Sequence, residues 1–265
     1  MMRPTQATTS AIPIAVIVLV MGVLFWPQTS PGQTVAQSQA RYKACMTKVA
    51  TDPQTAFDDA VQWEGLGGGL AARHCALAAL MAIGLYAEAA QGFEKLADAV
   101  RADKAFKARL LVQGVRAWIA ADNPERATAL ADTALNMTAE TSPETITTLM
   151  LRAQALALQG AYWDAADDLN RVIDSQPQNA EALVLRGAAY RQLDALDLAL
   201  EDLDRALKIE PTHPEGLLER GIVYRLQGRK QAARTDWRRL IASAPDGPAG
   251  RTAKTNLYRL DSGLN

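Results

Sequence analysis

Few residues in this 265-residue chain could carry out chemistry. It contains two histidines, His74 and His213, and two cysteines, Cys45 and Cys75. Neither histidine belongs to an HExxH pair, and no neighbouring residues suggest a Ser-His-Asp set. The cysteine spacing does not fit a metal or redox motif. We therefore expect no catalytic residue, no metal and no cofactor, and a protein that is not an enzyme.

Two other patterns also favour structural roles. Residues 65–69 read GLGGG, but no strand precedes them and no Lys-Ser/Thr pair follows, so a phosphate-binding loop is not supported. We interpret these glycines as a flexible linker. Asp167 and Asp168 are adjacent in an expected helix and lie on different faces, which makes them a poor acid–base pair.

The N-terminal segment predicts export. Arg3 precedes an apolar run at 11–26, and small residues follow that run. This pattern is typical of a secretory signal, with cleavage after Ala36 or Ala40. The run is short for a membrane span of about 20 residues, but an uncleaved anchor is the alternative. In both cases we expect residues 41–265 outside the cytoplasm, in a bacterial periplasm, either soluble or tethered to the inner membrane.

An exported protein with an even number of cysteines is expected to form a disulfide. Cys45 and Cys75 lie in expected helices that should be neighbours. Closing this loop would stabilise the fold by roughly 3–4 kcal/mol in the chain-entropy treatment. Two buried thiols that pack as small apolar groups are the alternative.

A 34-residue period organises the second half of the chain. RGAAYRQL at 186–193 and RGIVYRLQ at 220–227 both read Arg-Gly-x-x-Tyr-Arg. The same register contains Ala165, Ala199 and Ala233, then Asp168, Asp202 and Asp236, and then Pro177, Pro211 and Pro245. Periods of about 20–50 residues indicate solenoids or other repeat arrays.

Each repeat predicts two amphipathic helices. In the unit from Ala180 to Pro211, apolar residues recur at helical spacing in two stretches separated near Asp194. Gly187 and Ala199 are small where the two helices must approach each other. Pro211 ends the second helix because it has no backbone N–H.

The repeats resemble the tetratricopeptide repeat (TPR), with the pattern W-x2-L-G-x2-Y and then G-x-Y-x2-A-x3-F-x2-A-x4-P. Over 146–177 the matching residues are Leu149, Ala153, Leu156, Gly160, Tyr162, Ala165, Leu169 and Pro177. Over 214–245 they are Leu217, Gly221, Tyr224, Gly228, Ala233, Trp237 and Pro245, with Lys230 in place of the usual Tyr. The match is weaker upstream.

The resemblance implies an all-α fold, a right-handed superhelical solenoid. We expect the signal or anchor and its linker in 1–40, and a divergent capping hairpin with the glycine linker in 41–69. About four TPR hairpins should fill 70–245, at 70–100, 107–137, 146–177 and 180–245, the last holding two. A capping helix and tail should occupy 246–265.

Three Arg–Asp pairs recur with the repeat, each 16 residues apart: Arg152/Asp168, Arg186/Asp202 and Arg220/Asp236. Because one member lies on each helix of a hairpin, antiparallel packing can join them within a repeat or with the next one. We interpret them as structural ion pairs that fix the stacking register. Contact with a charged ligand is the alternative.

The resemblance also implies that the first helix of each hairpin lines a concave groove for a peptide or helix of a protein partner. The corresponding residues are Met150, Gln154, Leu158, Val184, Ala188, Arg191, Leu218, Ile222 and Arg225. They lack the Lys, Asn and Arg with which chaperone-tail-binding members clamp a terminal carboxylate. Their composition predicts a ligand with apolar anchors and some acidic character. Packing against neighbouring helices is the alternative.

Charge is distributed unevenly. The net charge of −1 does not favour nucleic acid. Residues 122–219 hold 18 acidic and 7 basic residues, whereas residues 220–265 hold 3 and 10. Lys230, Arg234 and Arg238 form a basic stripe, which is a solvated helix face or a dock for an anionic surface. Head-to-tail self-association is a further hypothesis.

The sequence thus predicts a non-enzymatic protein–protein interaction scaffold or adaptor of the cell envelope. A structural tether that docks through the basic stripe, or an accessory subunit of an envelope enzyme complex, is the alternative.

Overall fold

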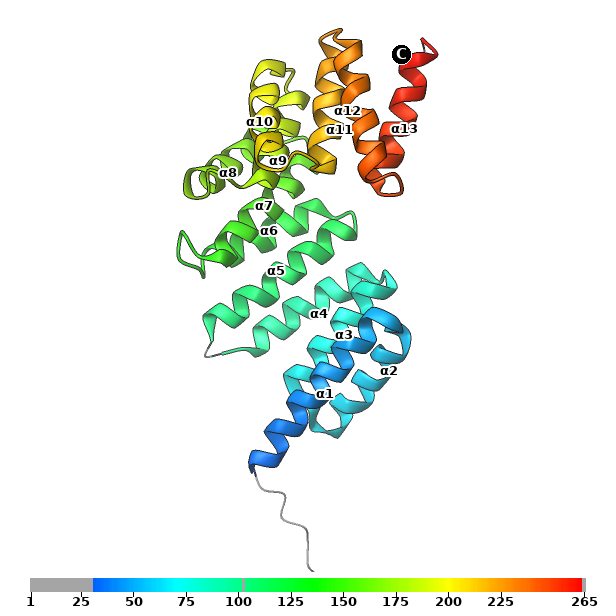
Figure 1. Cartoon of the computed structure of the whole chain (residues 1–265). Coiled ribbons are helices and arrows are strands. Elements are labelled where there is room, and N and C mark those ends of the chain that lie inside the picture. The colour runs from blue at the N-terminus through cyan, green and yellow to red at the C-terminus, as the bar shows by residue number, and fades with distance from the viewer. Residues whose placement is uncertain (1–30, 102, 264–265) are drawn as a thin grey trace, which may run out of the picture.

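The computed structural model describes residues 31–101 and 103–263, which form thirteen α-helices and no strand (Figure 1). The predicted signal or anchor at residues 11–26 lies outside the described residues. The helices are α1 (Pro31–Thr51), α2 (Pro53–Trp63), α3 (Gly69–Ile83), α4 (Tyr86–Ala99), α5 (Lys104–Ala120), α6 (Pro124–Leu135), α7 (Pro143–Leu158), α8 (Tyr162–Ser175), α9 (Ala180–Gln192), α10 (Leu196–Ile209), α11 (Pro214–Leu226), α12 (Lys230–Ser243) and α13 (Pro248–Asp261).

The predicted all-α solenoid is confirmed, and its five hairpins occupy the ranges that the sequence indicated. The hairpins are α3/α4, α5/α6, α7/α8, α9/α10 and α11/α12, and α13 packs on α12 as the expected cap. Figure 1 shows them stacked in chain order from α1 to α13. The first helices α5, α7, α9 and α11 contact one another in succession. We call the surface of α3, α5, α7, α9 and α11 the first-helix wall.

The same backbone feature closes all five hairpins. The turn between the two helices contains one residue in the left-handed region, with φ between 54° and 92°. A residue in this region reverses the direction of the chain at the end of a helix. The backbone N–H groups that follow it can then donate to the last carbonyl groups of that helix. These residues are Gly84, Asp122, Gly160, Asp194 and Gly228.

Small residues let the two helices of a hairpin approach. A Cβ at Gly187 would lie 2.9 Å from Cγ of Leu203 on the partner helix. A Cβ at Gly221 would collide with the indole of Trp237, which is fully buried between α11 and α13. The repeated glycine is therefore a packing requirement, as the spacing predicted.

The N-terminal hairpin of α1 and α2 turns at Asp52, as predicted, but α1 begins at Pro31 and not near residue 41. The predicted glycine linker connects α2 to α3, and it is helical over most of its length. Residues 64–68 form a helical turn, and Gly67 and Gly69 have φ of 89° and 57°. Residues 53–83 are apolar and long enough to suggest a membrane span, but the helix is broken at Gly67, and α2 packs against α3.

A disulfide joins Cys45 of α1 to Cys75 of α3, the pair that the sequence predicted. Both residues are buried in a small cluster with Ala60 and Ala76. The bridge therefore ties the divergent hairpin to the first repeat.

Candidate functional site

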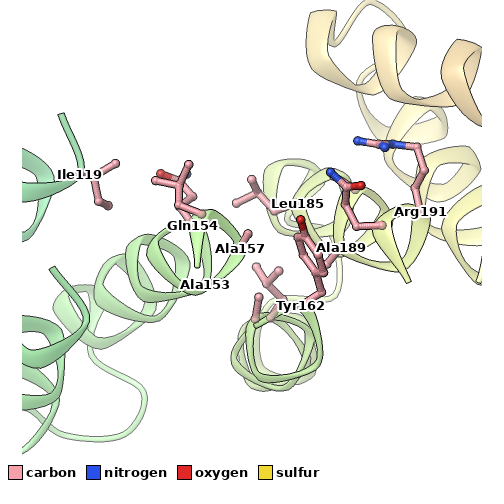
Figure 2. A pocket seen from close by; sticks show the side chains of 13 residues that line it. Ile119, Ala153, Gln154, Ala157, Tyr162, Leu185, Ala189 and Arg191 are labelled. Atoms are coloured by element: carbon pink, nitrogen blue, oxygen red, sulfur yellow. The ribbon is translucent and has the colours of Figure 1, made fainter. Parts of the chain in front are cut away.

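The first-helix wall contains an apolar cleft between α7 and α9, with a volume of about 430 Å³. Figure 2 shows side chains of α7 and α9 facing each other across it, with Tyr162 of α8 below. The residues that line this α7–α9 cleft are Ile119, Ala153, Gln154, Ala157, Leu158, Tyr162, Ala165, Leu169, Leu185, Ala188, Ala189, Arg191 and Gln192.

Alanines create the space in this cleft. Ala157 on α7 and Ala188 on α9 occupy positions where a longer side chain would fill the gap between the helices. Leu158 stands at its edge with 57% of its surface exposed. Such a concave apolar surface can bury an apolar side chain of a partner, at about 25 cal/mol per Å².

Four of the nine predicted groove residues line this cleft: Gln154, Leu158, Ala188 and Arg191. The prediction is wrong for Val184, which is only 2% exposed. Its Cγ2 lies 3.2 Å from the place of a Cβ at Gly216, so the start of α11 covers it. Val184 therefore stabilises the stack and is not available to a ligand.

Arg191 lines the cleft but is not the available cation that was predicted. Its Nε donates to Oε2 of Glu219 at 2.6 Å, and both side chains are 17% exposed. This pair joins α9 to α11. An acidic ligand was predicted from the positive charges of Arg191 and Arg225, and Glu219 already neutralises the first of them. Arg225 is exposed on α11 and does not line the cleft.

The other three predicted groove residues, Met150, Leu218 and Ile222, are half-buried. Met150 packs against the core around Leu183, while Leu218 and Ile222 pack against the core around Trp237. These three residues lie outside the α7–α9 cleft. They pack against neighbouring helices, which was the alternative to a groove position.

Sequence reasoning missed several cleft residues, among them Ile119, Ala157 and Leu185. Ile119, Ala157 and Arg191 each lie three residues before the left-handed turn residue of their hairpin. Counting back from that turn would have placed Ile119 on the same wall. The TPR pattern in α5 is too weak to locate that turn from the sequence alone.

All three predicted Arg–Asp pairs form within their own hairpins. In the central pair, Nε and Nη2 of Arg186 donate to the two carboxylate oxygens of Asp202, each at 2.7 Å. The third donor, Nη1, reaches Asn170 on α8 of the preceding hairpin at 2.6 Å. Hydrogen bonds with Asp202 raise the pKa of Arg186 above its ordinary value. The guanidinium thus joins three helices.

The other two arginines repeat this arrangement. Arg152 binds Asp168 and reaches Asp132 on α6, and Arg220 binds Asp236 and reaches Asp204 on α10. Since each buried aspartate accepts two hydrogen bonds from its arginine, and each arginine also reaches the preceding hairpin, these pairs can hold the stack in register.

The basic stripe on α12 is partly neutralised. Nε of Arg234 donates to Oδ1 of Asp261 on α13 at 2.6 Å. Lys230 and Arg238 are exposed. The stripe therefore offers two exposed cations and not three. Its middle residue, Arg234, instead helps to hold the capping helix α13 in place.

His74 belongs to a polar contact that joins α1, α3 and α5. Its Nδ1 lies 2.9 Å from the hydroxyl of Tyr42, and its Nε2 lies 3.0 Å from the amide nitrogen of Gln113. A neutral ring satisfies both partners, donating from Nδ1 and accepting at Nε2. His213 instead caps α11 by accepting from the N–H of Gly216. Within the described ranges, no three potential metal ligands cluster.

Acid should weaken the His74 contact. Burial lowers the pKa of His74 below its ordinary 6.5. Because the unfolded chain then binds the proton more readily, the stabilisation is present above about pH 6.5 and is lost as the pH falls toward the folded-state pKa. We expect His74→Gln to reduce the fall in unfolding free energy between pH 7 and pH 5, measured by urea denaturation. An unchanged pH profile would contradict this assignment.

The comparisons with known proteins identify the repeats. Residues 180–213 and 215–247 each match a tetratricopeptide repeat family. A thermophilic TPR protein of Thermus thermophilus is similar over 69% of this chain and 94% of its own, with 20% identity and a TM-score of 0.56. The MamA crystal structure is similar over 68% and 96%, with 16% identity and a TM-score of 0.52. At these identities the likeness shows the fold. No curated protein sequence matches.

Proposed function

We propose that this chain, a tetratricopeptide-repeat protein, is an interaction scaffold that binds a segment of a protein partner on its first-helix wall. The observation that carries the proposal is the α7–α9 cleft, an apolar hollow built from alanines in the middle of the array. Helical solenoids use extended surfaces of this kind to bind partners. The cleft can receive an apolar side chain that anchors the partner segment.

We further propose that the scaffold acts outside the cytoplasm, in the cell envelope. The Cys45–Cys75 disulfide supports this, because disulfides persist in oxidising compartments, and so does the apolar run at 11–26. Cleavage after Ala36 or Ala40 would remove only the start of α1, where residues 35–40 are exposed or half-buried. The mature protein would retain Cys45 and its disulfide. An uncleaved run would tether the array.

Panning a displayed library of random dodecapeptides on the native protein tests the binding proposal. We expect enriched peptides to bind Ala157→Phe more than about tenfold more weakly, because the new ring fills the cleft and displaces an apolar anchor. Ala242→Phe is the matched control, since Ala242 is exposed on α12, away from the cleft. Enriched peptides that bind Ala157→Phe and the native protein equally, with the fold retained, would contradict the proposal.

A further inference from the structure

Helix α13 continues the 34-residue register of the repeats as the first helix of a sixth one. It begins at Pro248, 34 positions after Pro214, which begins α11. Three further residues of α13 match residues of α11 at the same distance: Gly250 matches Gly216, Tyr258 matches Tyr224 and Leu260 matches Leu226. The capping helix therefore corresponds to the first half of a hairpin.

One side of α13 packs on the preceding hairpin, as the matching side of α11 does. A Cβ at Gly216 would stand 3.2 Å from Cγ2 of Val184 in the hairpin before it. Gly250 lies against the end of α12, where a Cβ would collide with the carbonyl oxygen of Ala244. Ala253 is fully buried on this side. The register therefore holds in the packing as well as in the sequence.

The opposite side of α13, which we call its outer side, is uncovered. In α11 the matching side carries Leu217 and Gly221, which are buried under α12. The residues 34 positions later, Arg251 and Thr255, are exposed, and Tyr258 on the same side is 67% exposed. Among the residues that the structure describes, α13 packs on α11 and α12 alone. Figure 1 shows it at the end of the stack, beside α12 and with no helix beyond it.

Lys254 stands at the position that the stacking arginines occupy in complete repeats. Arg220, 34 residues earlier, binds Asp236 on the second helix of its own hairpin and Asp204 on the preceding hairpin. The position that matches Asp204 holds Arg238, and no second helix follows α13 within the described ranges. Lys254 and Arg238 are both exposed, and neither forms an ion pair with a described residue.

We propose that the outer side of α13 binds an acidic amphipathic helix of a protein partner, which takes the place of a second helix and completes a sixth hairpin. A helix fits because the matching side of α11 is covered by one, and the repeat register carries this arrangement on to α13. The inference goes beyond the proposed function, because it does not use the α7–α9 cleft.

The charge of the outer side selects an acidic partner. Lys254 and Arg238 lack the carboxylates that the complete repeats place there. Arg251 adds a third cation, since its Nη1 donates to a backbone carbonyl, that of Asp246, and not to a carboxylate. Complementary charge of this kind steers a partner to the site and fixes its register. Tyr258 offers the partner helix an aromatic surface beside these cations.

A displayed library of single α-helices tests the inference on the native protein. Each helix has fourteen residues, the length of α12, with alanine as the background and one face randomised. We expect enriched helices to carry Asp or Glu and to bind Lys254→Glu about tenfold more weakly, because a like-charge contact replaces an exposed ion pair. Tyr258→Ala should weaken them about fivefold. Lys95→Glu is the matched control, since Lys95 is exposed on α4, in another hairpin.

Exchanging the charges gives a second readout. An enriched helix whose acidic residue is replaced with Lys should bind Lys254→Glu about tenfold more tightly than it binds the native protein. A role of Lys254 in folding alone would not reverse the preference in this way.

The other outcomes overturn the inference. Enriched helices that bind Lys254→Glu and the native protein equally, or no enrichment, would make the outer side a solvated cap only. Salt-dependent dimerisation in sedimentation, abolished by Lys254→Glu, would make a second copy of this chain the occupant. Binding to phosphatidylglycerol vesicles in place of helices would make it a lipid surface. Ala157→Phe should leave the enriched helices bound, so each of these results leaves the proposed function intact.

Discussion

Replacing Asp202 with alanine is expected to lower the free energy of unfolding by about 3 kcal/mol or more, because it leaves Arg186 in a confined site without its partner. Asp202 is only 2% exposed and accepts two hydrogen bonds from that guanidinium. Equilibrium urea denaturation, with hydrogen exchange of α9 and α10, measures the loss.

Arg205→Ala is the control for this prediction. Arg205 lies 3.5 Å from Asp202 but its side chain is 38% exposed, so its removal should cost less than about 1 kcal/mol. The double variant Arg186→Met with Asp202→Leu should recover most of the stability lost in Asp202→Ala, because no buried charge is left unpaired. A loss below about 1 kcal/mol in Asp202→Ala would show that the pair does not hold the stack.

The double variant Cys45→Ala with Cys75→Ala is expected to destabilise the N-terminal end by about 3.5 kcal/mol, the chain-entropy value for a loop of this length. The bridge joins α1 to α3, so the loss should appear as faster hydrogen exchange in α1 and α2. Exchange in α9 to α12 should not change, since repeats contact mainly their neighbours. Equal protection of α1 with and without the bridge would contradict this account.

The sequence was sufficient to predict features that repeat with the 34-residue period. The Arg–Asp pairs could be predicted because both members recur 16 residues apart, on the two helices of one hairpin. The disulfide could be predicted because Cys45 and Cys75 are the only cysteines. The hairpins of the strongest repeats likewise follow from glycine, alanine and proline at fixed positions.

Contacts between hairpins could not be predicted in this way. The repeat position of Val184 predicts a groove residue, but the start of α11 covers it. This burial depends on how one repeat is oriented against the next. Arg191 and Glu219 are 28 residues apart and belong to no repeating pattern, so their pair was invisible in the sequence. The α7–α9 cleft likewise lies between two hairpins, where alanines of both line it.

A crystal structure of the native protein with the most strongly enriched dodecapeptide tests the central claim most directly. The account predicts an apolar side chain of the peptide between Ala157 and Ala188, in the α7–α9 cleft. A peptide bound on the second helices, with that cleft left empty, would contradict it.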